Sequence, residues 1–267
     1  MLAQILLDDL DAFLVELNRA SARAILPLFR ADHGLEDKGG EAGFDPVTAA
    51  DKGAESAIRA LISRRYPDHG VIGEEHGEDR PGADFVWVID PIDGTRGFIA
   101  GLPLWTTLIG LRHEGRPVLG SIGQPFLGEI FIGSAAGSRL IANDGEQPLR
   151  TRAGVPLSQA IIATTDPEGC FDREEMTAWR ALRRASRLAR LGCDAYAYAM
   201  VAAGRLDLVV EAGLKCWDID AAIPVIAGAG GLVTDWAGGP VGQRGGQVVL
   251  AGDRSLLEAA LAAMSAS

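Results

Sequence analysis

Acidic residues that directly follow apolar runs are the side chains of this sequence most able to do chemistry. In "DFVWVIDPIDGT" (84–95), Asp90 and Asp93 end a run that reads as a buried strand, and a Gly-Thr turn comes next. A buried carboxylate is costly unless a positive charge lies close to it. The same arrangement recurs in "DPVTAAD" (45–51), "GEEHG" (73–77) and "WDID" (217–220).

These four segments together predict a site for divalent cations. Each acid alone could simply cap a helix, but carboxylates held close together repel one another and are driven toward neutrality. Mg²⁺ resolves that conflict, because it prefers sites made entirely of oxygen. His76 is the only histidine in these segments, which argues against Zn²⁺. The acids that the segments supply are Asp51, Glu74, Asp90, Asp93 and Asp218.

The turn after Asp93 predicts an anion site beside the metal. Gly94 allows the backbone to approach a ligand closely, Thr95 can cap a helix start, and free N–H groups at a helix start attract anions. No Ser, Cys or His nucleophile stands in or beside this turn. A metal next to an anion site therefore indicates that metal-activated water attacks a phosphate. A Ca²⁺-stabilised structural protein would explain the carboxylates but not the anion site.

Three of these motifs resemble the signature blocks of the inositol monophosphatase superfamily of Mg²⁺-dependent, lithium-sensitive phosphatases. They are "GEE", "WVIDPIDGT" and "WDIDAAIPVIAGAGG", in the family's order, and the resemblance covers most of the chain. It implies a layered αβαβα sandwich, assembly as a homodimer, and roughly two or three Mg²⁺ ions in each active site.

The resemblance also implies a metal ligand set. Glu74, Asp90 and the carbonyl of Ile92 match ligands of a first metal. Asp90, Asp93 and Asp218 match ligands of a second. Metals about 3.5–4 Å apart can hold both the attacking and the leaving oxygen of an in-line displacement.

The remaining catalytic roles are carried over in the same way. Thr95, oriented by Asp51, resembles the pair that, with Glu74, positions and deprotonates the attacking water. The N–H groups of Gly94 and Thr95 are expected to hold phosphate oxygens.

Two acids outside the metal set bear on which phosphate is hydrolysed. By the family resemblance, Glu211 matches a residue that contacts the alcohol part of the substrate, and Asp194 stands where inositol phosphatases tend to have a small neutral residue. Two acids facing the leaving alcohol suit a cationic group such as a protonated amine. The alternative for Asp194 is that it caps a helix beginning at Ala195.

Several segments are similar to the histidinol-phosphate phosphatases of this superfamily, which act late in histidine biosynthesis. Histidinol phosphate carries an amine and an imidazole, so it fits the two spare acids better than uncharged inositol does. The subgroup's Gly-Asp pair corresponds to "GCDAYAY", in which Cys193 is inserted, so Gly192, Cys193 and Asp194 are expected to contact substrate with Asp93 and Glu211. The similar segments are "FDPVTAAD", "DPIDGTRGFIAGLPLWTTLIGL", "ATTDPEGCF" and "DLVVEAGLKCWD".

Other functions stay open at this point. Inositol-1-phosphate, a broader range of small phosphates and, less well matched, a nucleotide 3′-phosphate are alternative substrates of the same chemistry. A nucleotide calls for a basic or stacking pocket, which Asp194 and Glu211 do not provide. A catalytically inactive relative of the fold would have a broken metal set, whereas every expected carboxylate and Thr95 is present.

Composition and charge argue against several classes of protein. The formal net charge of −11 opposes binding to nucleic acid through a basic surface. No run is long and apolar enough to span a membrane, and the acidic N-terminal run does not read as a signal peptide. Three irregularly spaced cysteines indicate reduced thiols, so we expect a cytoplasmic protein. The one basic run, "RALRRASRLAR" (180–190), is expected to be the solvated face of a helix.

The pattern of elements changes near residue 150, which predicts an α/β protein whose first half is α+β. Residues 1–150 read as helices, two strands and then antiparallel hairpins, and they carry most of the metal ligands. Residues 151–267 alternate strand and helix, with helices expected at 174–188 and 218–231, and they carry Asp218 and the substrate-reading residues. The two parts are expected to form one catalytic unit.

Overall fold

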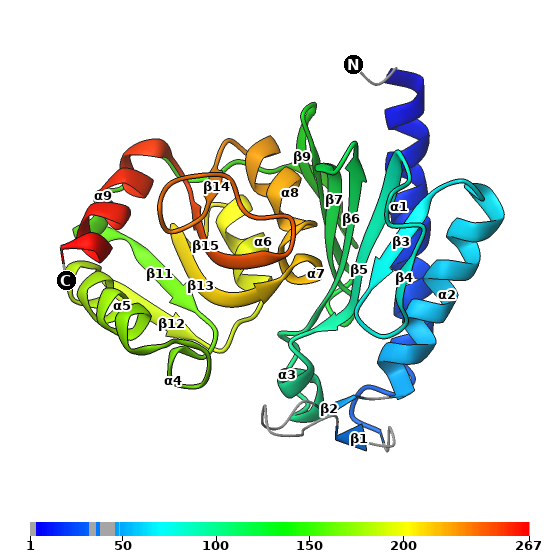
Figure 1. Cartoon of the computed structure of the whole chain (residues 1–267), viewed down its shortest axis with the longest axis horizontal. Helices are drawn as coiled ribbons and strands as arrows, with labels where there is room; N and C mark the ends of the chain where they lie inside the picture. Colours follow the sequence, from blue (N-terminus) through cyan, green and yellow to red (C-terminus); the bar gives the residue numbers. More distant parts are fainter. Residues whose placement is uncertain (1–3, 32–35, 38–45, 48, 267) are drawn as a thin grey trace.

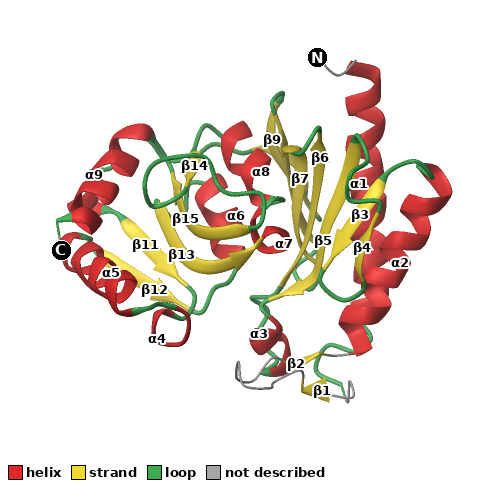
Figure 2. Ribbon diagram, viewed as in Figure 1, coloured by secondary structure: helices red, strands yellow, loops and turns green. Residues whose placement is uncertain are grey.

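The structure, a computed structural model, describes residues 4–31, 36–37, 46–47 and 49–266 of the chain. Helices and sheets stack in the order helix, sheet, helix, sheet, helix across the molecule (Figure 1 and Figure 2). This arrangement confirms the predicted αβαβα sandwich. Among the described helices, none combines the length and the apolar character that crossing a bilayer requires. Asp45, which opens the first acidic segment, lies outside the described residues.

The larger sheet is built from the first half of the chain. Helices α1 and α2 cover its outer face, where Phe13, Leu17 and Ile58 pack with Trp87 and Ile109. Strands β3 and β5 run parallel, and the other neighbouring pairs are antiparallel. The strand order is β10-β9-β8-β7-β6-β5-β3-β4, and the elements are α1 (Gln4–Ile25), α2 (Ala49–Arg65), β3 (Gly70–Gly73), β4 (Gly77–Asp79), β5 (Phe85–Asp93), β6 (Thr106–His113), β7 (Arg116–Gln124), β8 (Glu129–Ser134), β9 (Gly137–Ala142) and β10 (Gly145–Pro148).

The smaller sheet is built from the second half. Helices α5 and α9 cover its outer face, where Trp179, Leu182 and Leu257 pack with Ile162 and Val249. Strand β11 is parallel to both β12 and β13, and β15 is antiparallel to β13 and β14. The strand order is β12-β11-β13-β15-β14, and the elements are β11 (Ile161–Thr164), α5 (Arg173–Ala185), β12 (Leu188–Leu191), β13 (Leu208–Lys215), β14 (Leu232–Thr234), β15 (Gly245–Ala251) and α9 (Arg254–Ser265).

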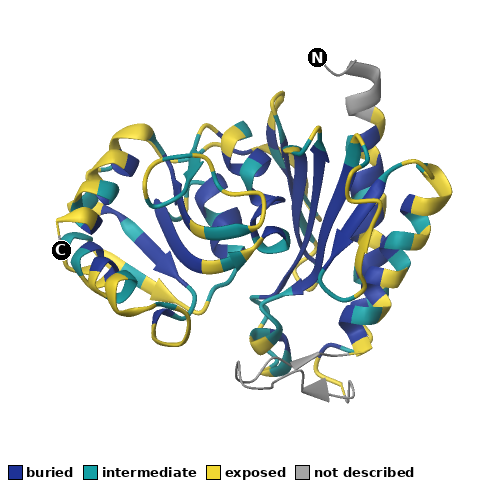
Figure 3. Ribbon diagram, in the orientation of Figure 1, coloured by how far each residue is buried: buried dark blue, intermediate teal, exposed yellow. Residues whose placement is uncertain are grey.

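Short helices fill the space between the two sheets. Ile122 and Phe131 of the larger sheet, Val209 of the smaller sheet, and Ala199 and Val225 of the helices belong to one buried core. This shared core makes the inner faces of both sheets buried (Figure 3). The helices are α6 (Tyr196–Ala202), α7 (Cys216–Ile219) and α8 (Ala222–Gly228), and the remaining described elements are β1 (Glu36–Asp37), β2 (Pro46–Val47), α3 (Thr95–Ile99), the 3₁₀ turn Leu157–Gln159 and α4 (Pro167–Cys170).

The helix predicted at 174–188 ends earlier than expected. It ends at Ala185, and Leu188–Leu191 forms β12, an exposed edge strand beside β11 (Figure 3). The pairing of Ile161 with Leu188 joins distant segments and outweighs the local helical preference. The prediction that 180–190 is one helical face is therefore wrong for its last residues, although all of its arginines are exposed to solvent.

The helix predicted at 218–231 is divided into α7 and α8. Pro224 is the third residue of α8, where a backbone N–H has no acceptor within the helix, so proline is tolerated there. The predicted boundary at residue 150 falls between the two sheets, since β10 ends at Pro148 and β11 begins at Ile161. A division into two units there stays a prediction.

A row of glycines brings the middle helices close to the larger sheet. Gly110, Gly120 and Gly133 pair with one another across β6, β7 and β8. A Cβ atom on Gly120 would lie 2.2 Å from the carbonyl oxygen of Ala221, and one on Gly133 would lie 2.4 Å from the Cα of Val225. Larger side chains here would push α8 and the residues before it away from the sheet. Backbone contact therefore sets the spacing of these two layers.

We expect Gly120→Ala to lower the free energy of unfolding by about 1–3 kcal/mol, because the added methyl group overlaps the Ala221 carbonyl in a packed layer. Gly53→Ala is the matched control, because Gly53 lies within α2 with open space around it, and Ala in a helix is favoured over Gly by about 1 kcal/mol. Urea unfolding of both variants measures the difference. Equal stabilities would contradict a packing role for the glycine row.

Candidate active site

A bulge at the end of β5 turns Asp90 and Asp93 toward the same place. Residues three apart in a regular strand face opposite sides of the sheet. Here Asp90 pairs with Leu108 and Asp93 with Thr106, so three steps along β5 match two along β6 and one residue is extra. Such a bulge re-aims the side chains that follow it. Pro91 has no N–H to give to the ladder, which is compatible with a bulge at this point.

Asp218 of α7 completes a three-carboxylate cluster with these two residues. Each of Asp90, Asp93 and Asp218 offers an oxygen, and the three oxygens lie within 4.8 Å of one another. Asp93 Oδ2 accepts a hydrogen bond from the N–H of Ala195 at 2.7 Å, and Asp218 Oδ2 accepts one from the N–H of Lys215 at 2.6 Å. Asp90 is only 2% exposed, and its Oδ1 finds no hydrogen-bond partner among the described residues.

The pKa values of these acids reflect first their burial and then the negative charges around them. Burial raises the pKa of Asp90 well above its ordinary value, and the negative charges of Glu74 and Asp93 raise it further. Burial likewise raises the pKa of Asp93, and burial raises the pKa of Asp218 to about 6. A cation among the three carboxylates removes this penalty. Because every donor is an oxygen, and one is buried without a partner, the cluster fits Mg²⁺.

Glu74 and Asp51 adjoin this cluster from two other elements. Strands β3 and β5 are parallel, and Gly73 of β3 pairs with Ile89 of β5. Glu74 and Asp90 directly follow these two residues, so they lie side by side at the same end of the sheet. The charges of Glu74 and Asp51 both contribute to the raised pKa of Asp90. Asp51 is 2% exposed and lies in the first turn of α2. The structure therefore places the other four acids of the sequence prediction near Asp90.

Glu55 supports the loop that carries Glu74, and the sequence interpretation missed it. It is fully buried on α2, and its carboxylate accepts hydrogen bonds from the backbone N–H groups of Glu75 at 2.8 Å and His76 at 3.2 Å. Arg59 Nε also donates to it at 2.7 Å. The signal was available, because residues four apart in a helix share a face and Glu55 lies four residues after Asp51.

The Gly94–Thr95 turn lies beside the cluster. Gly94 has φ 84°, in the left-handed region that favours glycine, and it is the N-cap residue of α3. Thr95 is the first residue of α3, so the prediction that Thr95 caps a helix is wrong. The Thr95 hydroxyl donates to the carbonyl of Ile92 at 3.0 Å. The pairing of Thr95 with Asp51, and phosphate binding by this turn, stay predictions.

Asp194 lies against this turn from the second half of the chain. A Cβ atom on Gly94 would be 3.1 Å from its carboxyl carbon. Burial raises the pKa of Asp194 to about 6, and the positive charge of Arg96 opposes that rise. The capping alternative for Asp194 is wrong, because the N-cap residue of α6 is Ala195 and its N-terminus has no side-chain capping hydrogen bond.

Glu211 on β13 is the second acid outside the metal set. It is 3% exposed, and it accepts hydrogen bonds from the hydroxyls of Thr165 at 2.8 Å and Thr164 at 3.2 Å. Burial raises the pKa of Glu211 to about 7, and the charge of Asp194 contributes to the rise. Asp194 and Glu211, the two acids outside the predicted metal ligands, therefore lie close enough for their charges to interact.

Gly192 and Cys193 connect β12 to Asp194. The N–H of Gly192 donates to the carbonyl of Thr165 at 2.9 Å, which ties this loop to the end of β11. Cys193 is partly buried, and burial raises the pKa of its thiol. Contact of either residue with substrate stays a prediction.

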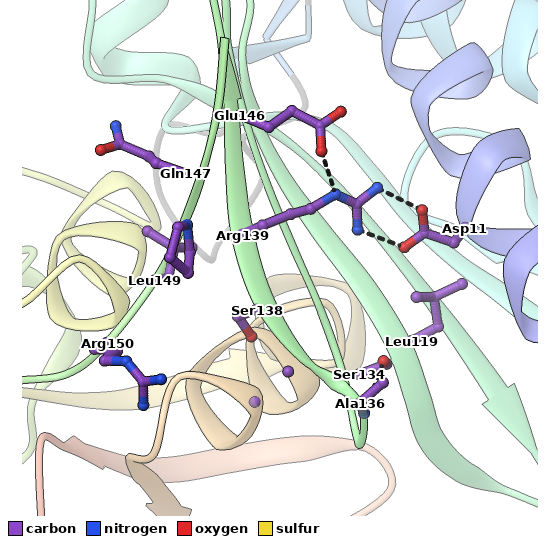
Figure 4. A pocket seen from close by; sticks show the side chains of 13 residues that line it. Asp11, Leu119, Ser134, Ala136, Ser138, Arg139, Glu146, Gln147, Leu149 and Arg150 are labelled. Atoms are coloured by element: carbon purple, nitrogen blue, oxygen red, sulfur yellow. Dashed lines mark hydrogen bonds and ion pairs between the residues drawn. The ribbon is translucent and has the colours of Figure 1, made fainter.

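A hollow of about 700 Å³ lies apart from these acids, between α1, the β9–β10 hairpin and α8 (Figure 4). Arg139 is the central charged group, and it is paired with Asp11 at 2.5 and 2.8 Å and with Glu146 at 3.1 Å. Because its neighbours already neutralise Arg139, the hollow has no concentration of charge comparable to that around Asp90.

Comparisons with known proteins agree with this geometry. The sequence pattern of the inositol monophosphatase family matches residues 6–267. The bifunctional phosphatase IMPL2, chloroplastic, of Arabidopsis thaliana is 44% identical over 221 residues, which are 82% of this chain and 62% of that protein. The chain thus spans less than two thirds of the length of that relative. The histidinol-phosphatase of Chlorobaculum parvum is 38% identical over 193 residues, which are 72% of this chain and 73% of that protein.

A solved structure has the same fold. An inositol monophosphatase from Zymomonas mobilis superposes with a TM-score of 0.85 at 37% sequence identity, covering 97% of this chain and 98% of that one. The inositol-1-monophosphatase of Mesorhizobium japonicum is 33% identical over 229 residues, which are 83% of this chain and 85% of that protein.

We expect Glu211 to make the metal-free protein less stable as the pH rises. The pKa of Glu211 is raised from 4.5 to about 7 in the fold, so its contribution to stability is complete below pH 4.5 and is lost as the pH rises through 7. In urea unfolding with EDTA, the free energy of unfolding of Glu211→Gln relative to that of the wild type should increase by on the order of 3 kcal/mol between pH 4.5 and pH 8. A difference in the free energy of unfolding that stays constant across this pH range would contradict a raised pKa for Glu211.

Proposed function

Because this chain belongs to the inositol monophosphatase family, whose members are Mg²⁺-dependent phosphatases, we propose that it hydrolyses L-histidinol phosphate to L-histidinol and phosphate. The observation that carries the phosphatase chemistry is the cluster of Asp90, Asp93 and Asp218 beside the Gly94–Thr95 turn. The observation that favours histidinol phosphate is the second pair of acids, Asp194 and Glu211, next to that cluster.

The metal ligands would be the carboxylates of Glu74, Asp90, Asp93 and Asp218 with the carbonyl of Ile92. Bound Mg²⁺ offsets the carboxylate charge and stabilises negative charge on the phosphoryl oxygens. The N–H groups of Gly94 and Thr95 would hold two of those oxygens, because Gly94 leaves the backbone accessible at this turn.

The attacking water would be placed by side chains on the opposite side of the phosphate from the leaving alcohol. Thr95, oriented by Asp51, would position this water, and Glu74 would take its proton. The Thr95 hydroxyl, which donates to the carbonyl of Ile92, would turn to hydrogen-bond the water instead.

The leaving alcohol would lie between the cluster and the smaller sheet. Asp194 reaches the Gly94 turn, and Glu211 is anchored by the Thr164 and Thr165 hydroxyls, so both are held before substrate arrives. Their charges suit the protonated amine of histidinol phosphate. Inositol-1-phosphate is the second candidate, supported by the similarity to inositol monophosphatases, which would use the same metal site with a neutral alcohol.

We also propose that the protein acts as a cytoplasmic homodimer in histidine biosynthesis. Cys170, Cys193 and Cys216 are free thiols, which suits a reducing compartment. Homodimerisation is supported by family resemblance alone.

Substrate identity is tested by phosphate release with Mg²⁺ from histidinol phosphate and inositol-1-phosphate at matched concentrations. We expect a higher kcat/KM for histidinol phosphate, because its amine meets two carboxylates. Asp194→Ala should then lower kcat/KM for histidinol phosphate by about tenfold or more, as loss of a charged contact does, and affect an aryl phosphate much less. An equal loss of kcat/KM for histidinol phosphate and for the aryl phosphate would show that Asp194 does not recognise the substrate. A preference for inositol-1-phosphate would overturn the proposed substrate and leave the chemistry standing.

The metal chemistry is tested by Asp93→Asn. The asparagine carbonyl can still accept from the N–H of Ala195, so the fold should persist, but the lost charge should lower kcat more than about 100-fold. Asp172→Asn is the control, because Asp172 is the exposed N-cap of α5, a helix on the outer face of the smaller sheet (Figure 1). Near-normal turnover by Asp93→Asn would contradict the assignment of Asp93 as a metal ligand. No phosphate release from the wild type on any phosphomonoester would favour a catalytically inactive relative.

A further inference from the structure

A buried ion pair joins the larger sheet to the segment that follows α7. Arg112 of β6 and Asp220 are 7% and 3% exposed, and Arg112 Nε donates to Asp220 Oδ2. Arg112 Nη2 also donates to the carbonyl of Gln243 at 2.7 Å, in the connection between β14 and β15. One side chain of the first half thus holds two separate segments of the second half.

This pair lies two residues from a predicted metal ligand. Asp220 follows Asp218 by two positions, and α7, which carries Asp218, is only four residues long. Cys216 of α7 packs with Val86 and Val88 on the inner face of β5. The same strand carries Asp90 and ends at Asp93, so α7 lies along the strand that supplies the other two carboxylates of the cluster. A shift of α7 along β5 would move Asp218 relative to Asp90.

The neighbouring backbone leaves little room for such a shift. Val86 pairs with Arg112, and Val88 pairs with Gly110. A Cβ atom on Gly110 would lie 3.1 Å from the backbone N of Ala221 and 3.2 Å from the Cβ of Asp220. The glycine therefore fixes how closely the segment after α7 approaches the sheet. Contact of this kind limits the distance between the layers, but it does not fix position along the strand.

A directional interaction is needed to fix the position of α7 along the strand. A buried ion pair adds little to stability compared with apolar side chains of similar volume, because desolvation offsets the attraction. Its hydrogen bonds have preferred directions, however, which apolar contacts lack. Arg112 donates to both Asp220 and the Gln243 carbonyl, so its guanidinium fixes the residue that directly follows α7 and ties it to the connection between β14 and β15.

We propose that Arg112, through Asp220, is a positioning residue for metal binding, which sets Asp218 in register with Asp90 and Asp93. The inference rests on the Mg²⁺ site of the proposed function. It assigns to Arg112 and Asp220 no contact with metal or substrate. Their effect is exerted through the placement of α7.

The chain offers a matched control in Arg152 and Asp207. Arg152 donates to both carboxylate oxygens of Asp207 at 2.8 and 2.6 Å, and Asp207 is fully buried. Both residues belong to the second half, and Asp207 also accepts from the N–H of Ile161. Removal of Arg152 leaves Asp207 buried without its arginine, as removal of Arg112 leaves Asp220, but at a place away from α7.

The test measures Mg²⁺ binding by titration calorimetry, with Mg²⁺ alone as the ligand, together with the Tm of each metal-free protein. The variants are Arg112→Met, the double variant Arg112→Met/Asp220→Leu, and Arg152→Met. Arg112→Met leaves Asp220 buried and unpaired, so its Tm should fall. The double variant removes both charges, so its Tm should recover toward that of the wild type. If Arg112→Met does not fold, the double variant carries the test.

We expect the Mg²⁺ Kd to rise roughly 10- to 100-fold in both Arg112 variants and to stay within about twofold of the wild type in Arg152→Met. A double variant with recovered Tm and still weakened Mg²⁺ binding would separate positioning from stability. A double variant that binds Mg²⁺ as the wild type does would overturn the inference, as would an equal loss in Arg152→Met. A wild type that binds no Mg²⁺ would overturn the proposed metal site and this inference with it.

Discussion

The holding of three partly or fully buried carboxylates close together is the constraint on which the rest of this structure depends. Asp90, Asp93 and Asp218 offer oxygens within 4.8 Å of one another, in surroundings that raise the pKa of each. Acids with freedom to move would separate under their mutual repulsion. The fold prevents that by placing two of them on a bulged strand and by giving Asp93 and Asp218 backbone N–H donors. A site that is costly without its cation is thereby kept ready to bind one.

The cluster depends on the packing of layers, because its members come from both halves of the chain. Asp90 and Asp93 end a strand of the larger sheet, whereas Asp218 follows a strand of the smaller sheet. The glycine row lets the middle layer approach the larger sheet closely, and the buried pair of Arg112 and Asp220 joins the two. Residues that touch no ligand therefore share control of the distances between the acids.

The two sheets make different contributions to the chemistry. Under the proposed function, the first half of the chain would supply three of the four metal-binding carboxylates and the Gly94 turn, and Asp194 and Glu211 of the second half would face the leaving alcohol. Strands β11 and β12 are parallel, and Thr165 and Asp194 lie just beyond their carboxyl ends, where open α/β sheets commonly bind ligands. This arrangement would allow the acids near the leaving alcohol to change while the carboxylate cluster, which draws on both halves of the chain, is kept.

Much of this protein could be read from the order of its amino acids. The acids after apolar runs, the Gly-Thr turn and the change of pattern near residue 150 depend on local signals, and the family motifs appear in order, so the carboxylate cluster and the layered fold were predictable. Tertiary structure decided what depends on contacts between distant segments. It made Leu188–Leu191 a strand beside β11 and put Asp194 against Gly94 in place of a helix cap. It also paired Arg112 with Asp220 across 108 residues, and it inserted the bulge that turns Asp90 and Asp93 to one side. Local propensity carries no information about such partners, because their energies exist only once the layers have packed.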